Sequence, residues 1–147
     1  MKKIFLIFII FIFLFSTYGN AEEKLSIEKQ LVGVVGAISG TVKTETRELK
    51  AGDKIYLNET IYAGVGAGTQ ILLLDQSTFT VGEDSEVVMD TFVFDTKTKD
   101  GKIVASVKAG SLKDISGLIS KKKPDSRTVK VQEGTIESRG TEFKQIV

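Results

Sequence analysis

Beyond residue 30, short apolar runs alternate with turn-forming residues along the whole chain. Within several runs apolar and polar residues alternate one by one, as Phe79 and Val81 do with Thr78 and Thr80. This period of two is typical of a strand with one buried face. Glycine, aspartate and asparagine between the runs favour turns. The residues that the pattern predicts as strands are 31–35, 40–43, 54–57, 69–74, 78–81, 87–94, 102–108 and 128–131.

Many short strands spaced by about 8–12 residues are typical of an all-β domain. We therefore predict a single all-β domain over residues 31–147, built as a twisted β-roll, a sandwich or a solenoid-like stack, with at most one or two short helical turns. The run 71–74 is apolar at every position, which favours a central strand that is buried on both faces. A helical spacing competes at 112–119, where Gly110 and Gly117 leave room for only a turn or two.

The start of the chain has the pattern of a secretory signal. Two lysines precede an apolar run over residues 4–15, and small residues stand before a cleavage point after Ala21. As a helix the run reaches ~18 Å, which is short of the ~30 Å hydrocarbon core of a bilayer. We predict a cleaved signal peptide over 1–21, a polar lead over 22–30, and a periplasmic or secreted product. The alternative is an uncleaved membrane anchor.

The composition excludes several classes of function. The chain carries 20 Lys and Arg against 19 Asp and Glu, and two of the lysines fall in the signal segment. The rest of the chain is near neutral and has no excess of positive charge that would favour binding of nucleic acid. The chain has no cysteine and no histidine, so it has no disulfide framework, no histidine-based triad, no cysteine nucleophile and no usual zinc ligand set. We predict no catalytic residues, no metal site, no cofactor and no enzymatic activity.

One local cluster of positive charge consists of Lys121, Lys122 and Lys123, just ahead of Pro124. The simplest interpretation is a solvated loop. The alternative is a weak contact with an anionic surface, either lipid head groups or a cell-wall polymer, where each basic residue contributes ~1 kcal/mol.

Four longer stretches follow one another in a distinctive order: LKAGDKIYLNETIYAGVGAGTQILLLDQSTFTVGEDSEVVMD, VKAGSLKDISGLI, PDSRTVKV and SRGTEF. Together they resemble the FecR-type domain of bacterial envelope proteins, over residues 32–143. The last stretch resembles the signature of that family. Its residues are Arg139, Gly140, Thr141, Glu142 and Phe143.

One departure from the family concerns a corner between two strands. Where the family has Asp-Gly-Ser, this chain has Asp75, Gln76 and Ser77. A tight type I′ hairpin turn needs positive φ at both central residues, and glutamine tolerates positive φ poorly. We therefore expect no type I′ turn at this corner.

The resemblance implies one of two roles. Some relatives are transmembrane regulators that pass a receptor signal to a cytoplasmic sigma factor, and others are exported proteins that carry the β-domain alone. This chain resembles the second kind, because its β-domain is not accompanied by the cytoplasmic and transmembrane parts of the regulators. We predict a non-catalytic periplasmic module for binding or scaffolding, whose partner is an envelope protein or a cell-wall polymer. The alternative is a component of envelope signal transduction, with FecR-like regulation of an extracytoplasmic sigma factor through a membrane partner.

A membrane itself is expected to touch the chain only through an uncleaved signal or a weak surface contact. For the signature, two interpretations stay open. In the preferred one, residues 141–147 form the last paired strand, with Phe143 in the core, and the signature is structural. In the other, this strand is an exposed edge that accepts a strand of a partner by β-augmentation.

Overall fold

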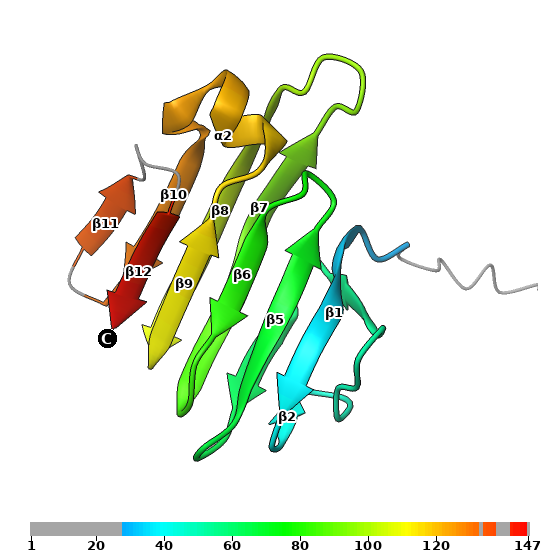
Figure 1. The fold of residues 1–147 in the computed structure, drawn as a ribbon, viewed down its shortest axis with the longest axis vertical. Coiled ribbons are helices and arrows are strands. Elements are labelled where there is room, and N and C mark those ends of the chain that lie inside the picture. The colour runs from blue at the N-terminus through cyan, green and yellow to red at the C-terminus, as the bar shows by residue number, and fades with distance from the viewer. Residues whose placement is uncertain (1–27, 133, 138–141, 147) are drawn as a thin grey trace, which may run out of the picture.

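The computed structural model describes residues 28–132, 134–137 and 142–146. Its strands form two six-stranded sheets that face each other as a sandwich (Figure 1). The strands are β1 (Leu31–Ser39), β2 (Val42–Lys43), β3 (Lys54–Tyr56), β4 (Thr60–Ala63), β5 (Gly68–Leu73), β6 (Thr78–Val81), β7 (Ser85–Phe94), β8 (Gly101–Ala109), β9 (Ser111–Ile115), β10 (Arg127–Val131), β11 (Gly134–Glu137) and β12 (Glu142–Ile146). Sheet A has the order β12-β9-β6-β5-β1-β3, and sheet B has the order β11-β10-β8-β7-β4-β2.

The chain passes back and forth between the two sheets as it proceeds from one side of the sandwich to the other. Strands β5 and β6 belong to sheet A, β7 and β8 belong to sheet B, and β9 returns to sheet A. Neighbouring strands are antiparallel except for β8 and β10, which run parallel. Between β9 and β10 the chain crosses one end of the sandwich through helix α2 (Leu118–Lys122) and a 3-10 turn (Pro124–Ser126) (Figure 1). We call residues 116–126 the crossover.

The hydrophobic core lies between the two sheets. Along β5, Thr69, Ile71 and Leu73 are buried while Gln70 and Leu72 are exposed, the alternation of a strand with one buried face. The inner faces of both sheets contribute aliphatic side chains that are almost fully buried. They include Val35, Ile55, Ile71, Val81 and Leu112 from sheet A, and Ile61, Val87, Ile103, Val107 and Val129 from sheet B.

The predicted all-β class is confirmed, and the sandwich is the architecture that the structure adopts. Each predicted strand overlaps an observed one, and the helical content is confined to α2 and the 3-10 turn in the described residues. Strand β4 was not predicted, because three of its four residues are buried and leave no clear alternation. Strand β9 was not predicted either. The apolar residues at 112–119 fall in two elements, since Leu112 and Ile115 are in β9 whereas residues 118 and 119 begin α2. Within β9, Leu112 is fully buried and Ile115 is exposed.

The prediction for the run 71–74 is half wrong. Strand β5 lies inside sheet A, as predicted, but it is not buried on both faces. Leu72 is 46% exposed and Leu74, in the turn that follows, is 47% exposed. Sheet B covers only the inner face of sheet A, so the outer apolar positions of β5 face solvent in the described part of the chain.

The corner at Asp75, Gln76 and Ser77 also corrects the sequence prediction. The loop is closed by hydrogen bonds from Leu73 N to Ser77 O (2.9 Å) and from Gln76 N to Leu73 O (3.0 Å). Gln76 has a φ of +67°. A type I′ turn is therefore absent, as expected, but the premise that glutamine would avoid positive φ is wrong here. Three-residue hairpin loops place a left-handed residue at their last position, and the buried neighbours on both sides hold Gln76 there.

The predicted signal peptide and most of the polar lead lie outside the described residues. Only residues 28–30 of the lead are described, immediately before β1.

Candidate functional site

The signature strand lies at one edge of sheet A. Arg139, Gly140 and Thr141 lie outside the described residues, whereas Glu142 and Phe143 begin β12. This strand pairs with β9, with Glu142 opposite Ile115 and Phe143 opposite Asp114. The strand is therefore paired on one side and is the outermost strand of sheet A among the described residues. The structural role of the signature stays a prediction.

The lysine cluster lies on the crossover. Lys121 and Lys122 are in α2 and Lys123 follows it, and all three are exposed. The Nζ atom of Lys122 donates a hydrogen bond to Thr98 O (2.6 Å) and lies 3.0 Å from Asp100 Oδ2. Lys122 therefore ties α2 to the loop between β7 and β8. A contact of the cluster with an anionic surface stays a prediction.

Exposed aliphatic side chains gather on the outer face of sheet A. Leu72, Leu74 and Ile115 are 46%, 47% and 42% exposed, and we call these three residues the outer row. In register, Leu72 lies opposite Thr78, and Thr78 lies opposite Ile115. The same line of partners ends at Glu142 in β12. The outer row therefore spans β5 and β9, with Thr78 of β6 between them, and ends beside the signature strand.

Directly beneath the outer row lies a group of charged residues, Asp75, Asp114 and Arg127, which we call the buried cluster. Their exposed fractions are 0%, 1% and 1%. Asp114 precedes Ile115 in β9, where consecutive residues point to opposite faces of the sheet. Asp75 follows Leu74 in the turn after β5. The buried cluster and the outer row therefore share the same short segments of backbone.

The geometry of the buried cluster centres on the guanidinium group. Arg127 donates from Nε to Asp114 Oδ2 (2.8 Å) and from Nη2 to Asp114 Oδ1, a bidentate arrangement. Its Nη1 atom is 3.6 Å from Asp75 Oδ2. The Cζ atom of Arg127 also lies 5.6 Å from the centre of the Phe79 ring, a cation–π distance. Since Arg127 begins β10 while Asp114 is in β9, the group joins the two sheets.

The other carboxylate of the cluster shapes the hairpin loop. Asp75 Oδ1 accepts hydrogen bonds from Ser77 N (3.2 Å) and from the Ser77 hydroxyl. Asp75 Oδ2 and Arg127 Nη1 are buried without a hydrogen-bond partner. Burial raises the pKa of Asp114 above its ordinary value, Arg127 opposes this shift, and the nearby charge of Asp75 adds to it.

Sequence reasoning missed the buried cluster, although a signal was present. Asp114 occupies the same face of β9 as the buried Leu112, two residues earlier, and Arg127 occupies the same face of β10 as the buried Val129. A charged residue at an inward position of a strand indicates a buried ionic contact, because an unpaired buried charge is strongly unfavourable. The signal is readable only once the strands are assigned, and β9 was not.

A second charged group lies on the side of the sandwich far from β12. Glu45, Arg47 and Glu59, which we call the loop cluster, connect the segment between β2 and β3 to the start of β4. Arg47 Nη2 lies 3.2 Å from Glu59 Oε2, and Glu59 Oε2 accepts a hydrogen bond from Tyr56 N (2.9 Å). Glu45 Oε1 accepts one from Thr60 N (3.1 Å). Hydrogen bonding by Thr60 lowers the pKa of Glu45, against the opposing effect of its partial desolvation.

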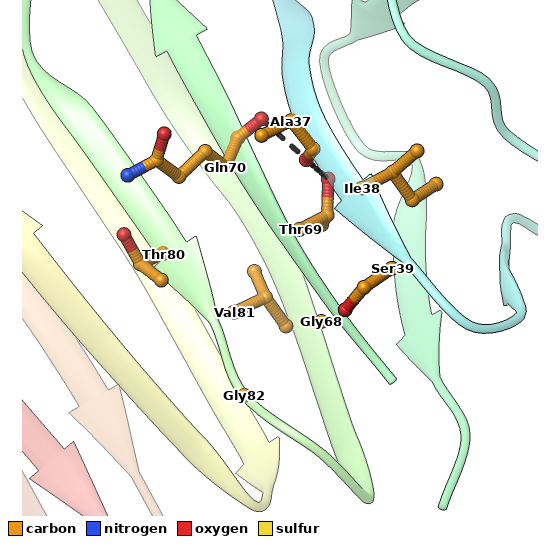
Figure 2. Close-up of a pocket in the computed structure, with 9 residues that line it drawn as sticks. All are labelled: Ala37, Ile38, Ser39, Gly68, Thr69, Gln70, Thr80, Val81 and Gly82. Carbon is orange, nitrogen blue, oxygen red and sulfur yellow. Dashed lines mark hydrogen bonds between the residues drawn. The ribbon is translucent and has the colours of Figure 1, made fainter. Parts of the chain in front are cut away.

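A shallow hollow lies at the opposite end of β5 from the outer row (Figure 2). Strand β1 has a bulge between Val35 and Ile38, and the Thr69 hydroxyl donates a hydrogen bond to Ala37 O (2.8 Å) there. The hollow carries no charged side chain. Its lining consists of Ala37, Ile38, Ser39, Gly68, Thr69, Gln70, Thr80, Val81 and Gly82.

The described residues lack two features. They contain no group of three or more acidic side chains that could hold a metal ion. Nor does any helix in this part of the chain have the length and apolar character needed to cross a bilayer.

Comparison with known proteins identifies the family. A sequence model of the FecR family, described as FecR protein, matches residues 59–147. The match covers more than half of the chain, which therefore belongs to the FecR family. It extends from the start of β4 to the signature strand, and so it includes the outer row and the buried cluster. No curated protein and no solved structure matches the chain.

Proposed function

We propose that this FecR-family chain is a non-catalytic binding module of the bacterial envelope that takes part in signal transduction. Membership of the FecR family supports a regulatory role rather than a catalytic one. The observation that carries the proposal is the outer row, three half-exposed aliphatic side chains from β5, the turn after it and β9, on one face of sheet A within the matched region. Exposed apolar side chains that gather on one face mark an interaction site more often than those that are scattered singly.

The partner that we propose is another envelope protein, met transiently. A stable interface buries ~800 Å² on each partner, and three half-exposed side chains supply a small part of that area. Such a set fits the apolar centre of a weaker signalling contact, with polar residues such as Thr78 and Thr80 around it. Export through the predicted signal peptide over residues 1–21 would bring the module to the periplasm or the exterior, where that partner resides.

Site-specific photo-crosslinking in intact cells tests this proposal. A photoreactive residue is placed at Leu72, at Ile115 and, as the control, at Val93, which is 58% exposed on β7 in sheet B. We expect one protein of the inner or outer membrane to be captured from positions 72 and 115 but not from position 93. Equal capture from all three positions, or capture of cell-wall glycan alone, would contradict the proposal.

A transcriptional readout separates signalling from mere binding. In the same cells, Leu72→Glu should change transcription of genes controlled by an extracytoplasmic sigma factor, while Val93→Glu should leave it unchanged. If both variants fold and neither alters transcription, the chain binds its partner without signalling. That result would favour a scaffolding role over signal transduction.

A further inference from the structure

The buried cluster contains more negative than positive charge. Two carboxyl groups and one guanidinium group lie together with at most 1% exposure. In the described part of the chain, the charged groups that act on Asp114 are Arg127 of β10 and Asp75 of the loop between β5 and β6. If both carboxyl groups are ionised, one negative charge remains uncompensated in the core. An uncompensated buried charge is so unfavourable that the group tends to keep or take up a proton instead.

The hydrogen bonding of the buried cluster also argues for a retained proton, because it leaves polar atoms without partners. Arg127 uses Nε and Nη2 on Asp114, and its Nη1 atom remains 3.6 Å from Asp75 Oδ2. Neither of these last two atoms has a hydrogen-bond partner. One guanidinium group therefore pairs fully with one carboxylate only. Since the two carboxyl groups interact, the proton belongs to the pair rather than to either residue.

The cluster also holds the crossover in place at three points. Asp114 is the next-to-last residue of β9 ahead of the crossover, and Arg127 is the first residue after it. Between these two points Asp75 contacts the backbone of the crossover, because Leu118 N donates a hydrogen bond to Asp75 O (2.7 Å). The backbone approach is so close that a Cβ on Gly117 would lie 2.3 Å from Asp75 O. Any change in the attraction among the three charged groups therefore acts on both ends of the crossover and on its contact with Asp75.

From this arrangement we propose that the buried cluster is a proton-dependent latch for the crossover. With one proton on the Asp75–Asp114 pair, the cluster is neutral and the crossover is held against the loop between β5 and β6. Loss of that proton as the pH rises leaves a net negative charge in the core and weakens the latch. Leu74 and Ile115 of the outer row adjoin Asp75 and Asp114 in the chain, so the outer row loosens with the crossover.

The sign of the pH dependence follows from proton linkage. Above the ordinary pKa of aspartate, which is 3.8, the unfolded chain has lost the proton that the folded cluster still holds. The folded state then binds more protons, so its stability falls as the pH rises, until the cluster itself releases the proton. For one retained proton, the equilibrium constant of unfolding increases by up to about tenfold for each pH unit in that interval.

The test compares the wild type with Asp114→Asn and with the control Asp84→Asn, which changes an exposed aspartate outside the crossover. Denaturant unfolding and amide hydrogen exchange of residues 117–126 are measured at steps between pH 5 and pH 9. In the wild type and in Asp84→Asn, stability and protection of the crossover should fall as the pH rises. In Asp114→Asn, which leaves one carboxylate with one guanidinium group, this dependence should disappear. An unchanged slope in Asp114→Asn would overturn the proposal.

A measurement on the wild type keeps the test decisive if Asp114→Asn does not fold. The carboxyl carbons of Asp75 and Asp114 are followed by ¹³C NMR over the same pH steps. We expect the carboxyl resonance of Asp114 to titrate above the ordinary range of aspartate, since burial raises its pKa. If neither buried carboxyl group titrates above that ordinary range, the latch does not exist. Neither outcome depends on whether a partner binds the outer row, so this proposal and the proposed function can fail separately.

Discussion

The buried cluster and the loop cluster both pair an arginine with a carboxylate, in two different environments. Arg127 and its two aspartates are excluded from water. In the loop cluster, the side chain of Arg47 is 32% exposed and that of Glu59 is 9% exposed. Water can reach the guanidinium group of Arg47 but not that of Arg127. We therefore expect the consequence of removing an ionic contact to be set by burial more than by the distance between the charges.

The two groups also differ in what they connect. The loop cluster joins segments that are close in the chain, since Arg47 and Glu59 are separated by 12 positions. The buried cluster joins sheet A to sheet B and fixes the crossover between them. Asp114 and Arg127 are nearly as close in the chain, at 13 positions, but Asp75 comes from the loop between β5 and β6 and is remote from both. The loop cluster therefore stabilises local loop geometry, whereas the buried cluster also holds a segment that is distant in the chain.

The largest expected effect comes from Arg127→Met. It removes the only positive charge of the buried cluster and leaves two carboxyl groups without compensation, so we expect a loss of ~3–5 kcal/mol in the free energy of unfolding. The matched change Arg47→Met in the loop cluster should cost ~1 kcal/mol or less. Urea denaturation of the two variants measures both values. Equal losses would show that burial does not decide the difference.

The next effect tests whether the signature strand belongs to the core around the buried cluster. Phe143 lies opposite Asp114 in register, while Glu142 lies opposite the exposed Ile115. Because cross-strand partners share a face of the sheet, Phe143→Ala should cost ~3 kcal/mol and Glu142→Ala less than ~0.5 kcal/mol. Thermal unfolding compares the two variants. A melting temperature of Phe143→Ala within a degree of the wild type would refute a place for Phe143 in the core.

A smaller effect is expected from Glu59→Ala. The carboxylate of Glu59 accepts a hydrogen bond from Tyr56 N and lies beside Arg47, so its loss should cost ~1.5–3 kcal/mol, the usual range for hydrogen bonds to a charged group. Glu59→Gln keeps an acceptor for Tyr56 N and should lose about half as much. If the two variants are equally destabilised, the charge rather than the hydrogen bond stabilises this loop.

The smallest effect concerns Glu45, and its sign is opposite to that of the buried cluster. Because Thr60 lowers the pKa of Glu45 below the ordinary value of 4.5, the ionised form stabilises the folded state. This contribution is complete above about pH 4.5 and is lost as the pH falls through the lowered pKa. Glu45→Gln should therefore reduce stability at neutral pH and flatten the decline in acid. An unchanged acid limb in unfolding curves from pH 2 to pH 5 would contradict it.

Most strands could be predicted because their signal is local. Phe79 and Val81 alternate with threonines, and β6 lies where the alternation predicts it. Strand β4 gave no such signal, since burial of Thr60 next to Ile61 breaks the alternation. The candidate site was less accessible to prediction. The signature resembles that of the family, but the run with Leu72 and Leu74 predicted a doubly buried strand, because apolar residues on both faces look the same whether or not a second layer covers the outer one.

The all-β class, the approximate position of most strands and the lack of histidine and cysteine chemistry follow from the amino-acid sequence alone. These depend on composition and on alternation between near neighbours, which folding does not change. That Leu72 and Ile115 share an open face, and that Asp75, Asp114 and Arg127 meet beneath it, becomes visible only in the folded sandwich. Such meetings depend on the register between strands that are distant in the chain, and register is set by the packing of the two sheets as a whole.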